Sequence, residues 1–204
     1  MFYWLTALSD GGDVFNLFRY ITFRAGGAFL TALVFGFIFG RPLINALRRK
    51  QGKGQPIRSD GPEGHFAKAG TPTMGGLLIV GALTFSTLLW ARLDNPFVWM
   101  VLFVTLSFAA IGFADDYAKV SKQNTSGVSG KVRILLGITI AAIAAYWAAQ
   151  YHPDDLTNRL AVPIFKDTLI NLGLLFVPFA VIVIVGSANA VNLTDGLDGL
   201  AIMP

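Results

Sequence analysis

The 204-residue sequence contains no cysteine, which excludes a disulfide framework and a thiolate metal site. Charged residues are also scarce, at 14%, whereas a soluble domain normally carries about a quarter. Both histidines, His65 and His152, are isolated and lack metal-ligand spacing, so we assign them no role. Hydrophobic residues instead make up 54% of the chain, and the mean hydropathy is +0.59. This balance excludes an ordinary soluble domain and indicates a membrane protein.

Five apolar runs approach the roughly 20 residues that a helix needs to cross the hydrocarbon core. They lie at about 24–47, 74–91, 97–114, 133–149 and 168–188. The first 23 residues are aromatic and amphipathic without a cleavage site, so we expect them to lie at the membrane interface. Residues 200–203 turn apolar again before Pro204, as if a sixth span began there. We therefore predict an all-α, polytopic transmembrane helix bundle, a single membrane domain over residues 1–204 that is truncated at its C-terminus.

Basic residues are distributed unevenly between the two sides of these spans. The segment between the first two runs carries six lysines and arginines, and the segment after the third run carries three more. The opposite side has Arg92, Arg159 and Lys166, and Arg19 and Arg24 before the first run weaken the contrast slightly. The positive-inside rule then places the N-terminus outside and both basic segments in the cytoplasm. Within the first segment, residues 51–59 are glycine-rich and basic but lack the spacing of a P-loop, so we interpret them as a cytoplasmic loop facing anionic lipid.

Two adjacent aspartates, Asp115 and Asp116, close the third apolar run. Carboxylates at the edge of hydrocarbon are costly to desolvate and usually mark a functional site. Lys119 follows four residues after Asp115 and three after Asp116, within reach of either on a helix. Neighbouring side chains diverge by about 100° around a helix, so one carboxylate could ligate Mg²⁺ while the other accepts a proton or orients a ligand. The alternative is a solvated helix end with a local ion pair.

A second polar cluster follows the fifth run. It contains Asn189, Asn192, Asp195 and Asp198, and a glycine follows each aspartate. The glycines allow a sharp turn or a close approach to a ligand, and the polar groups suit a nucleotide, a phosphate or a metal. The alternative is a turn whose asparagines and aspartates cap the next helix. Capping accounts for one or two of these residues and leaves the others unexplained.

The third motif, Lys-Ala-Gly-Thr-Pro-Thr-Met-Gly-Gly, spans residues 68–76 and opens the second run. Its hydroxyls and backbone N–H groups would lie at a helix N-terminus, which favours anions, and Lys68 adds a positive charge. The alternative is a proline at a helix start, flanked by threonine caps, with glycines for close helix packing. Four aspartates delivered to one membrane face nevertheless indicate a site for a divalent cation and a phosphorylated substrate.

The three motifs, in this order, closely resemble those of the phospho-MurNAc-pentapeptide translocase (MraY) family. They read K-A-G-T-P-T-M-G-G, A-D-D-Y-A-K and N-A-V-N-L-T-D-G-L-D-G-L-A. That family belongs to the polyprenyl-phosphate N-acetylhexosamine-1-phosphate transferases. The resemblance implies an inner-membrane enzyme of about ten helices that acts in peptidoglycan synthesis. Such enzymes use Mg²⁺ to move phospho-MurNAc-pentapeptide from its UDP carrier onto undecaprenyl phosphate, giving lipid I and UMP.

The resemblance also implies a role for each matching residue. Asp115, Asp116 and Lys119 are expected to be catalytic, and Asp195 is expected to join the two aspartates near Mg²⁺. The residues expected to contact substrate are Lys68, Thr73, Lys131, Asn189, Asn192, Gly196, Leu197 and Asp198. The implied partners are undecaprenyl phosphate, UDP-MurNAc-pentapeptide and membrane lipid, without nucleic acid, and homodimerisation stays open. The family pattern continues beyond this sequence with another aspartate and a histidine-rich loop, so we expect the chain alone to be inactive.

Two other functions stay open. Transfer of GlcNAc-1-phosphate to a polyprenyl phosphate is compatible with the acidic motifs, although the stretch 70–76 argues against it. A fragment of a cation transporter would also place acids in a membrane. Transporter acids usually lie at mid-depth, however, whereas here they gather at one face.

Overall fold

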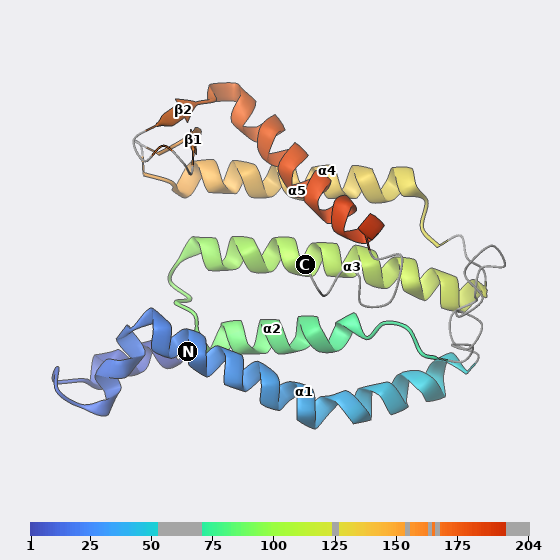
Figure 1. Cartoon of the computed structure of the whole chain (residues 1–204), viewed down its shortest axis with the longest axis horizontal. Helices are drawn as coiled ribbons and strands as arrows, with labels where there is room; N and C mark the ends of the chain where they lie inside the picture. The colour runs from blue at the N-terminus through green and yellow to red at the C-terminus, as the bar shows by residue number, and fades with distance from the viewer. Residues whose placement is uncertain (53–70, 124–126, 154–155, 163–164, 166–167, 195–204) are drawn as a thin grey trace. The chain divides into compact units, whose positions relative to one another are not determined.

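A computed structural model describes the chain except for residues 53–70, 124–126, 154–155, 163–164, 166–167 and 195–204. The chain divides into two compact units, Met1–Ser129 and Gly130–Pro204. In both units the described residues are mainly helical (Figure 1). The predicted all-α class is therefore confirmed, with one short β-hairpin added.

The first unit contains two 3₁₀ helices followed by three long α-helices. Its elements are η1 (Phe2–Leu8), η2 (Val14–Arg19), α1 (Ile21–Gln51), α2 (Gly76–Trp90) and α3 (Pro96–Lys122). Figure 1 shows α2 running antiparallel between α1 and α3. This order brings the end of α1, the segment before α2 and the C-terminal part of α3 to the same end of the unit. The opposite end holds the N-terminus and the turn between α2 and α3.

Local sequence explains where α3 begins and ends. The side chain of Asn95 accepts the N–H of Phe97 at 2.9 Å, and Pro96 occupies the first helical position, where no intrahelical N–H is needed. The helix ends at Lys122, because Gln123 adopts a left-handed conformation with φ of 47°. The acidic pair was predicted to lie at a helix end, but it lies inside α3. The helix that the apolar run forms continues past the pair to Lys122.

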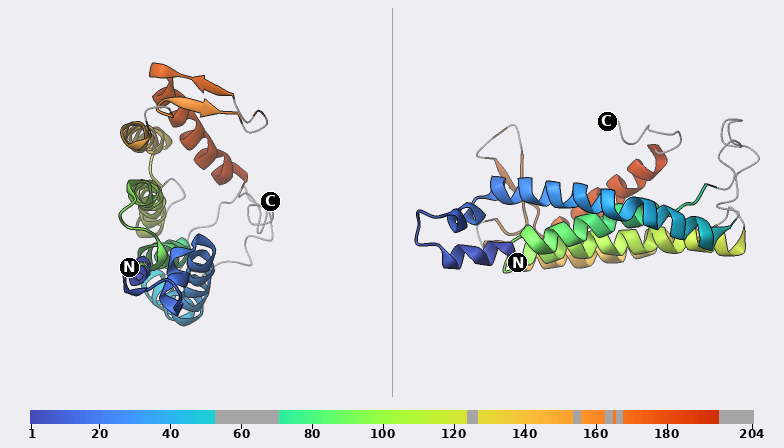
Figure 2. Two further views of the ribbon diagram at one scale, coloured as in Figure 1. Left: turned by 90° about the vertical axis from the view of Figure 1, so that its left-hand side faces the viewer. Right: turned by 90° about the horizontal axis from the view of Figure 1, so that it is seen from below.

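The second unit pairs two helices and a hairpin. Its elements are α4 (Gly130–Tyr151), β1 (Arg159–Ala161), β2 (Leu169–Asn171), η4 (Gly173–Leu175) and α5 (Phe176–Thr194). The two strands are antiparallel and form a short hairpin, visible in Figure 2. In the sequence this hairpin follows α4 and precedes α5. Helix α4 packs against α5, and the buried residues of α4 are small. Small side chains let helix backbones approach closely within a membrane.

The hairpin corrects the predicted start of the fifth span. Residues 168–172 were expected to be helical, but Leu169–Asn171 forms β2. Gly173 adopts φ of 49°, a left-handed conformation that interrupts a right-handed helix, and its N–H donates to the side chain of Asn171 at 2.9 Å. The helix therefore begins only after this turn. It also runs further than predicted, to Thr194.

Four described helical segments are long and apolar enough to cross a membrane, namely α1, α3, α4 and the continuous stretch Gly173–Thr194. Helix α2 is apolar but has only 15 residues. Most large apolar side chains on these helices are exposed, as expected where lipid replaces water. The chain is therefore a multi-pass membrane protein, and the count of five spans stays a prediction.

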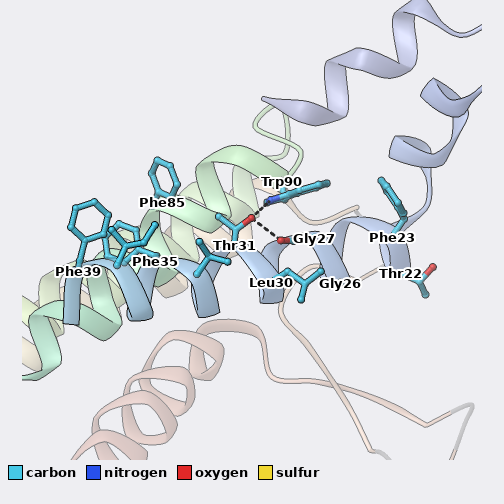
Figure 3. Close-up of a pocket in the computed structure, with 12 residues that line it drawn as sticks. Thr22, Phe23, Gly26, Gly27, Leu30, Thr31, Phe35, Phe39, Phe85 and Trp90 are labelled. Atoms are coloured by element: carbon cyan, nitrogen blue, oxygen red, sulfur yellow. Dashed lines mark hydrogen bonds between the residues drawn. The ribbon is translucent and has the colours of Figure 1, made fainter. Parts of the chain in front are cut away.

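Trp90, the last residue of α2, joins α2 to the first half of α1. Its indole N–H donates to the hydroxyl of Thr31 at 2.9 Å, and that hydroxyl donates to the carbonyl of Gly27 at 2.7 Å (Figure 3). A Cβ on Gly27 would overlap the indole ring. An open, apolar pocket of about 770 Å³ lies beside these residues along α1. Close contact between the two helices here thus depends on a residue without a side chain.

Candidate functional site

The acidic pair on α3 is the centre of a polar cluster at one end of the first unit. The ammonium Nζ of Lys119 lies 2.7 Å from Oδ2 of Asp115 and 3.8 Å from Oδ1 of Asp116, as the helical spacing predicts. The two carboxylates differ in exposure: the side chain of Asp115 is 9% exposed and that of Asp116 is 31% exposed. A buried carboxylate needs partners to offset its lost hydration.

Asp115 has such partners on both oxygens. Oδ2 accepts from Lys119, and Oδ1 accepts the backbone N–H of Val128 at 2.8 Å. Val128 follows Gly127, which adopts φ of 55°. Charge-assisted hydrogen bonds of this kind are short and strong. Asp115 is thus held between its own helix and the chain segment that follows α3.

Asp116 is held from the other side, by the segment that precedes α2. The hydroxyl of Thr73 donates to Oδ2 of Asp116 at 3.0 Å. The backbone of Thr73 is in turn held by Gln51, the last residue of α1: its Nε2 donates to the Thr73 carbonyl at 3.1 Å, and its Oε1 accepts the Thr73 N–H at 2.9 Å. The next residue, Met74, has φ of 72°, which is uncommon for a residue with a side chain. Hydrogen bonds therefore connect α1, the segment before α2 and α3 at this point.

Oδ1 of Asp116 is the most available carboxylate oxygen of the pair. It lies beyond hydrogen-bonding distance from Lys119, and its side chain is the more exposed of the two. Among the described residues, no group of three or more His, Cys, Asp or Glu gathers as a metal site. Mg²⁺, however, is usually held by one or two carboxylates together with substrate phosphates and water. The donor chemistry of this cluster therefore fits Mg²⁺, with Asp116 as the ligand that the described residues offer.

The structure brings together Thr73, Asp115, Asp116 and Lys119 of the predicted site residues. The following predicted residues lie outside the described part of the chain: Lys68, Asp195, Gly196, Leu197 and Asp198. Lys131 is exposed in the first turn of α4, in the second unit. Its expected contact with substrate stays a prediction.

The polar cluster was predicted to follow the fifth run, but its first part, as far as Thr194, lies inside the helix. Asn189 and Asn192 both lie within α5. The side-chain amide of Asn189 donates to the carbonyl of Val185, one turn earlier in its own helix, at 2.8 Å, and Asn192 is exposed. The apolar periodicity extends through these residues, so helix formation prevails over their preference for turns and caps.

Three residues that the sequence did not single out belong to this cluster. Gln51 had been interpreted as part of a loop, and no local pattern indicates that its amide binds a backbone 22 residues away. Val128 contributes only a main-chain N–H, which any residue other than proline would supply. Gly127 offered a weak signal, as a glycine among polar residues just after a long helix.

Comparisons with known proteins match the segment that carries Thr73 and the segment that carries the acidic pair. Residues 98–204 match glycosyl transferase family 4, and residues 68–80 match signature 1 of phospho-N-acetylmuramoyl-pentapeptide-transferase. Over its whole length the chain is 83% identical to the phospho-N-acetylmuramoyl-pentapeptide-transferase of Ruegeria pomeroyi, and 79% identical to that of Ruegeria sp. strain TM1040. The protein of the same name from Dinoroseobacter shibae is 70% identical. The chain spans 57% of the length of each of these curated relatives.

Proposed function

Because the chain belongs to glycosyl transferase family 4, we propose that it contributes to a phospho-MurNAc-pentapeptide transferase of the membrane. In the proposed reaction, UDP-MurNAc-pentapeptide and undecaprenyl phosphate give lipid I and UMP. One observation carries the proposal. Thr73 lies in the segment that matches the transferase signature, Asp116 lies in the segment that matches the family, and their side chains are hydrogen-bonded at 3.0 Å. The two matched segments thus meet in one polar site.

The chemistry of the reaction suits this site. An oxygen of the lipid phosphate forms a bond to the sugar-linked phosphorus, and the bond from that phosphorus to the UMP oxygen breaks. A phosphate monoester is largely ionised near neutral pH, so the attacking oxygen needs little help from a base. Catalysis then depends mainly on positive charge and alignment. Lys119 supplies a fixed ammonium for the diphosphate.

The two aspartates have different roles in this proposal. Asp116 would hold Mg²⁺ through its available oxygen, with Asp195 as the predicted second carboxylate. When bound, Mg²⁺ would neutralise charge on the diphosphate and on the leaving UMP. Asp115 has both oxygens engaged, so it orients Lys119 and the segment after α3. Thr73 fixes the direction of the Asp116 carboxylate.

Other residues are proposed to line the nucleotide and sugar side of the site on family resemblance alone. They are Lys68, Lys131, Asn189, Asn192, Gly196, Leu197 and Asp198. We further propose that the site faces the cytoplasm from the bacterial inner membrane. The last turn of α1, at the same end as the acidic pair, carries Arg48, Arg49 and Lys50, which supports this orientation under the positive-inside rule.

A chimera provides the test, because the relatives are longer than this chain. In the chimera, the chain is followed by the part of the Ruegeria pomeroyi relative that it does not cover. We expect the purified chimera to transfer phospho-MurNAc-pentapeptide onto undecaprenyl phosphate, to release UMP and to stop when EDTA removes divalent cations. Transfer from UDP-GlcNAc in place of the MurNAc donor would contradict the proposed donor. Mg²⁺ flux into proteoliposomes without any nucleotide dependence would contradict the enzyme class.

A further inference from the structure

The chain segment just after α3 makes an unusually close approach to the acidic pair. The backbone N–H of Val128 donates to Oδ1 of Asp115 at 2.8 Å. The preceding residue, Gly127, lies so close that a Cβ there would overlap the same carboxylate oxygen and would lie 2.9 Å from Cε of Lys119. The α-carbon of Gly127 thus forms part of the wall around the Asp115–Lys119 pair.

We infer that Gly127 and Val128 are positioning residues of the proposed transferase site, acting on Lys119 through the carboxylate of Asp115. The inference rests on the proposed function and assigns to it two residues that bind no substrate themselves. The carboxylate of Asp115 connects the Val128 N–H on one oxygen to the Lys119 ammonium, 2.7 Å away, on the other. Both contacts fix the rotation of one carboxylate group. Loss of the N–H contact removes one of these restraints and so loosens the direction of the ammonium.

Lys119 has a second anion nearby, which is why its direction needs to be fixed. Its Nζ lies 3.8 Å from Oδ1 of Asp116, the oxygen assigned above to Mg²⁺. If the Lys119 ammonium moved within hydrogen-bonding distance of this oxygen, it would compete with Mg²⁺ for it. Because the Asp115 carboxylate holds Lys119 at shorter distance, the available oxygen of Asp116 stays clear. The segment after α3 therefore keeps the two roles of the acidic pair separate.

Glycine at position 127 meets two separate requirements. Its φ of 55° is a left-handed conformation that residues with a Cβ adopt at a cost, and the adjacent carboxylate leaves no room for a Cβ. Asparagine tolerates left-handed φ better than alanine does, but it also carries a Cβ. Alanine at 127 therefore violates both requirements, whereas asparagine violates chiefly the second. Gly173 provides a matched control, because its φ is 49° and nothing lies within 4 Å of a Cβ built there.

The first experiment measures transfer by the chimera. We expect Gly127→Ala and Gly127→Asn to lower kcat about 10- to 100-fold, the range seen when residues that orient a catalytic group are lost. KM for the UDP donor should rise less than about threefold, because the charge of Lys119 remains in the site. Gly173→Ala and Gly173→Asn should leave kcat unchanged. A normal kcat in Gly127→Asn would overturn the inference, since only the backbone conformation would then matter.

The second experiment needs no activity and uses the chain itself in lipid nanodiscs. Hydrogen exchange of the Val128 amide reports its bond to Asp115 directly. We expect Gly127→Ala and Asp115→Ala to speed this exchange at least about tenfold, and Gly173→Ala to leave it unchanged. Rapid exchange of the Val128 amide hydrogen in the unsubstituted chain would overturn the inference. If the unsubstituted chimera transfers no phosphosugar, the proposed function fails, and the exchange experiment still decides whether Gly127 and Val128 hold Asp115.

Discussion

The two ends of the first unit each carry an ion pair with the same separation of 2.7 Å, yet the two pairs have different surroundings. The side chains of Lys119 and Asp115 are 21% and 9% exposed, and the backbone N–H of Val128 donates to Asp115. Arg92 and Asp94, in the turn between α2 and α3, are 48% and 37% exposed. Water screens the second pair, whereas the first is enclosed by the segment that follows α3. Enclosure, and not distance, distinguishes the candidate functional pair.

The end that carries Arg92 instead serves to hold the N-terminal segment. The ring of Tyr3 contacts two guanidinium groups, and its centroid lies 4.9 Å from Cζ of Arg24 and 4.7 Å from Cζ of Arg92. Aromatic side chains from η1, η2 and α1 gather around Trp90, and Figure 3 shows Phe23 and Trp90 in this region. Apolar and cation–π contacts of this kind tolerate small shifts. The polar cluster around Asp115 and Asp116 depends on defined donors and acceptors, so it should be more sensitive to single substitutions.

The largest contrast is expected when the cation of each pair is replaced by methionine. Lys119→Met removes the cation beside the buried Asp115 carboxylate, which should lower the free energy of unfolding by about 2 kcal/mol, less than for a fully buried pair. Arg92→Met removes an exposed ion pair with Asp94 and a cation–π contact with Tyr3, so it should lower that free energy by much less. Unfolding by SDS in mixed micelles measures both. Equal effects of the two substitutions would remove the basis of the comparison.

The next largest effect is expected from Gln51→Ala. Without the Gln51 amide, the Thr73 backbone loses two hydrogen bonds, and the hydroxyl that orients Asp116 is free to move. We expect kcat of the chimera to fall about tenfold. Asn45, an exposed amide on the same helix, is the control, and Asn45→Ala should have no effect. A double-substitution cycle sharpens the test: in a Thr73→Val background, Gln51→Ala should cost much less, and full additivity would contradict a route through Thr73.

A smaller effect is expected where α1 meets Trp90. Gly27→Ala forces a methyl group into the indole ring, and because that side chain can shift, we expect the free energy of unfolding to fall by about 1 kcal/mol. The adjacent Gly26 faces open space, so Gly26→Ala should not destabilise the helix. Transfer by the chimera should stay normal in both. A loss of transfer in Gly27→Ala alone would show that the two ends of the unit are coupled.

These contrasts also show which features of the fold and the site can be predicted from the sequence alone. The apolar runs predicted the long helices, and helical spacing predicted that Lys119 reaches both aspartates. Contacts between residues far apart could not be predicted, since nothing local to Thr73 indicates a partner 43 residues later. The hairpin was missed because the apolar residues of β2 continue directly into those of α5. The end of α5 was missed because Asn189 and Asn192 favour turns in isolation, whereas the helix already formed before them satisfies their backbone.

The smallest effect concerns acid stability at the Arg92 end. The hydrogen bond from Arg92 lowers the pKa of Asp94 below 3.8, its ordinary value. When folding lowers the pKa of a carboxyl group, the group stabilises the folded protein at any pH above its pKa in the unfolded state. This contribution is lost as the pH falls through its pKa in the folded state. Since Asp94 is exposed, the contribution should be slight. Thermal unfolding measured while the pH is lowered should therefore give almost superimposable curves for the unsubstituted chain and Asp94→Asn, and a wide gap at neutral pH would contradict this.

The central claim is that the end of the unit with Asp115 and Asp116 is the reactive one. It is tested most directly by the transfer rate of two chimeras that each lose one carboxylate charge without a change of shape. Asp116→Asn keeps an oxygen for the Thr73 hydroxyl but loses the charge assigned to Mg²⁺, so we expect transfer to fall at least about 100-fold. Asp94→Asn should transfer at the unsubstituted rate. An Asp116→Asn chimera that made lipid I at that same rate would contradict the claim.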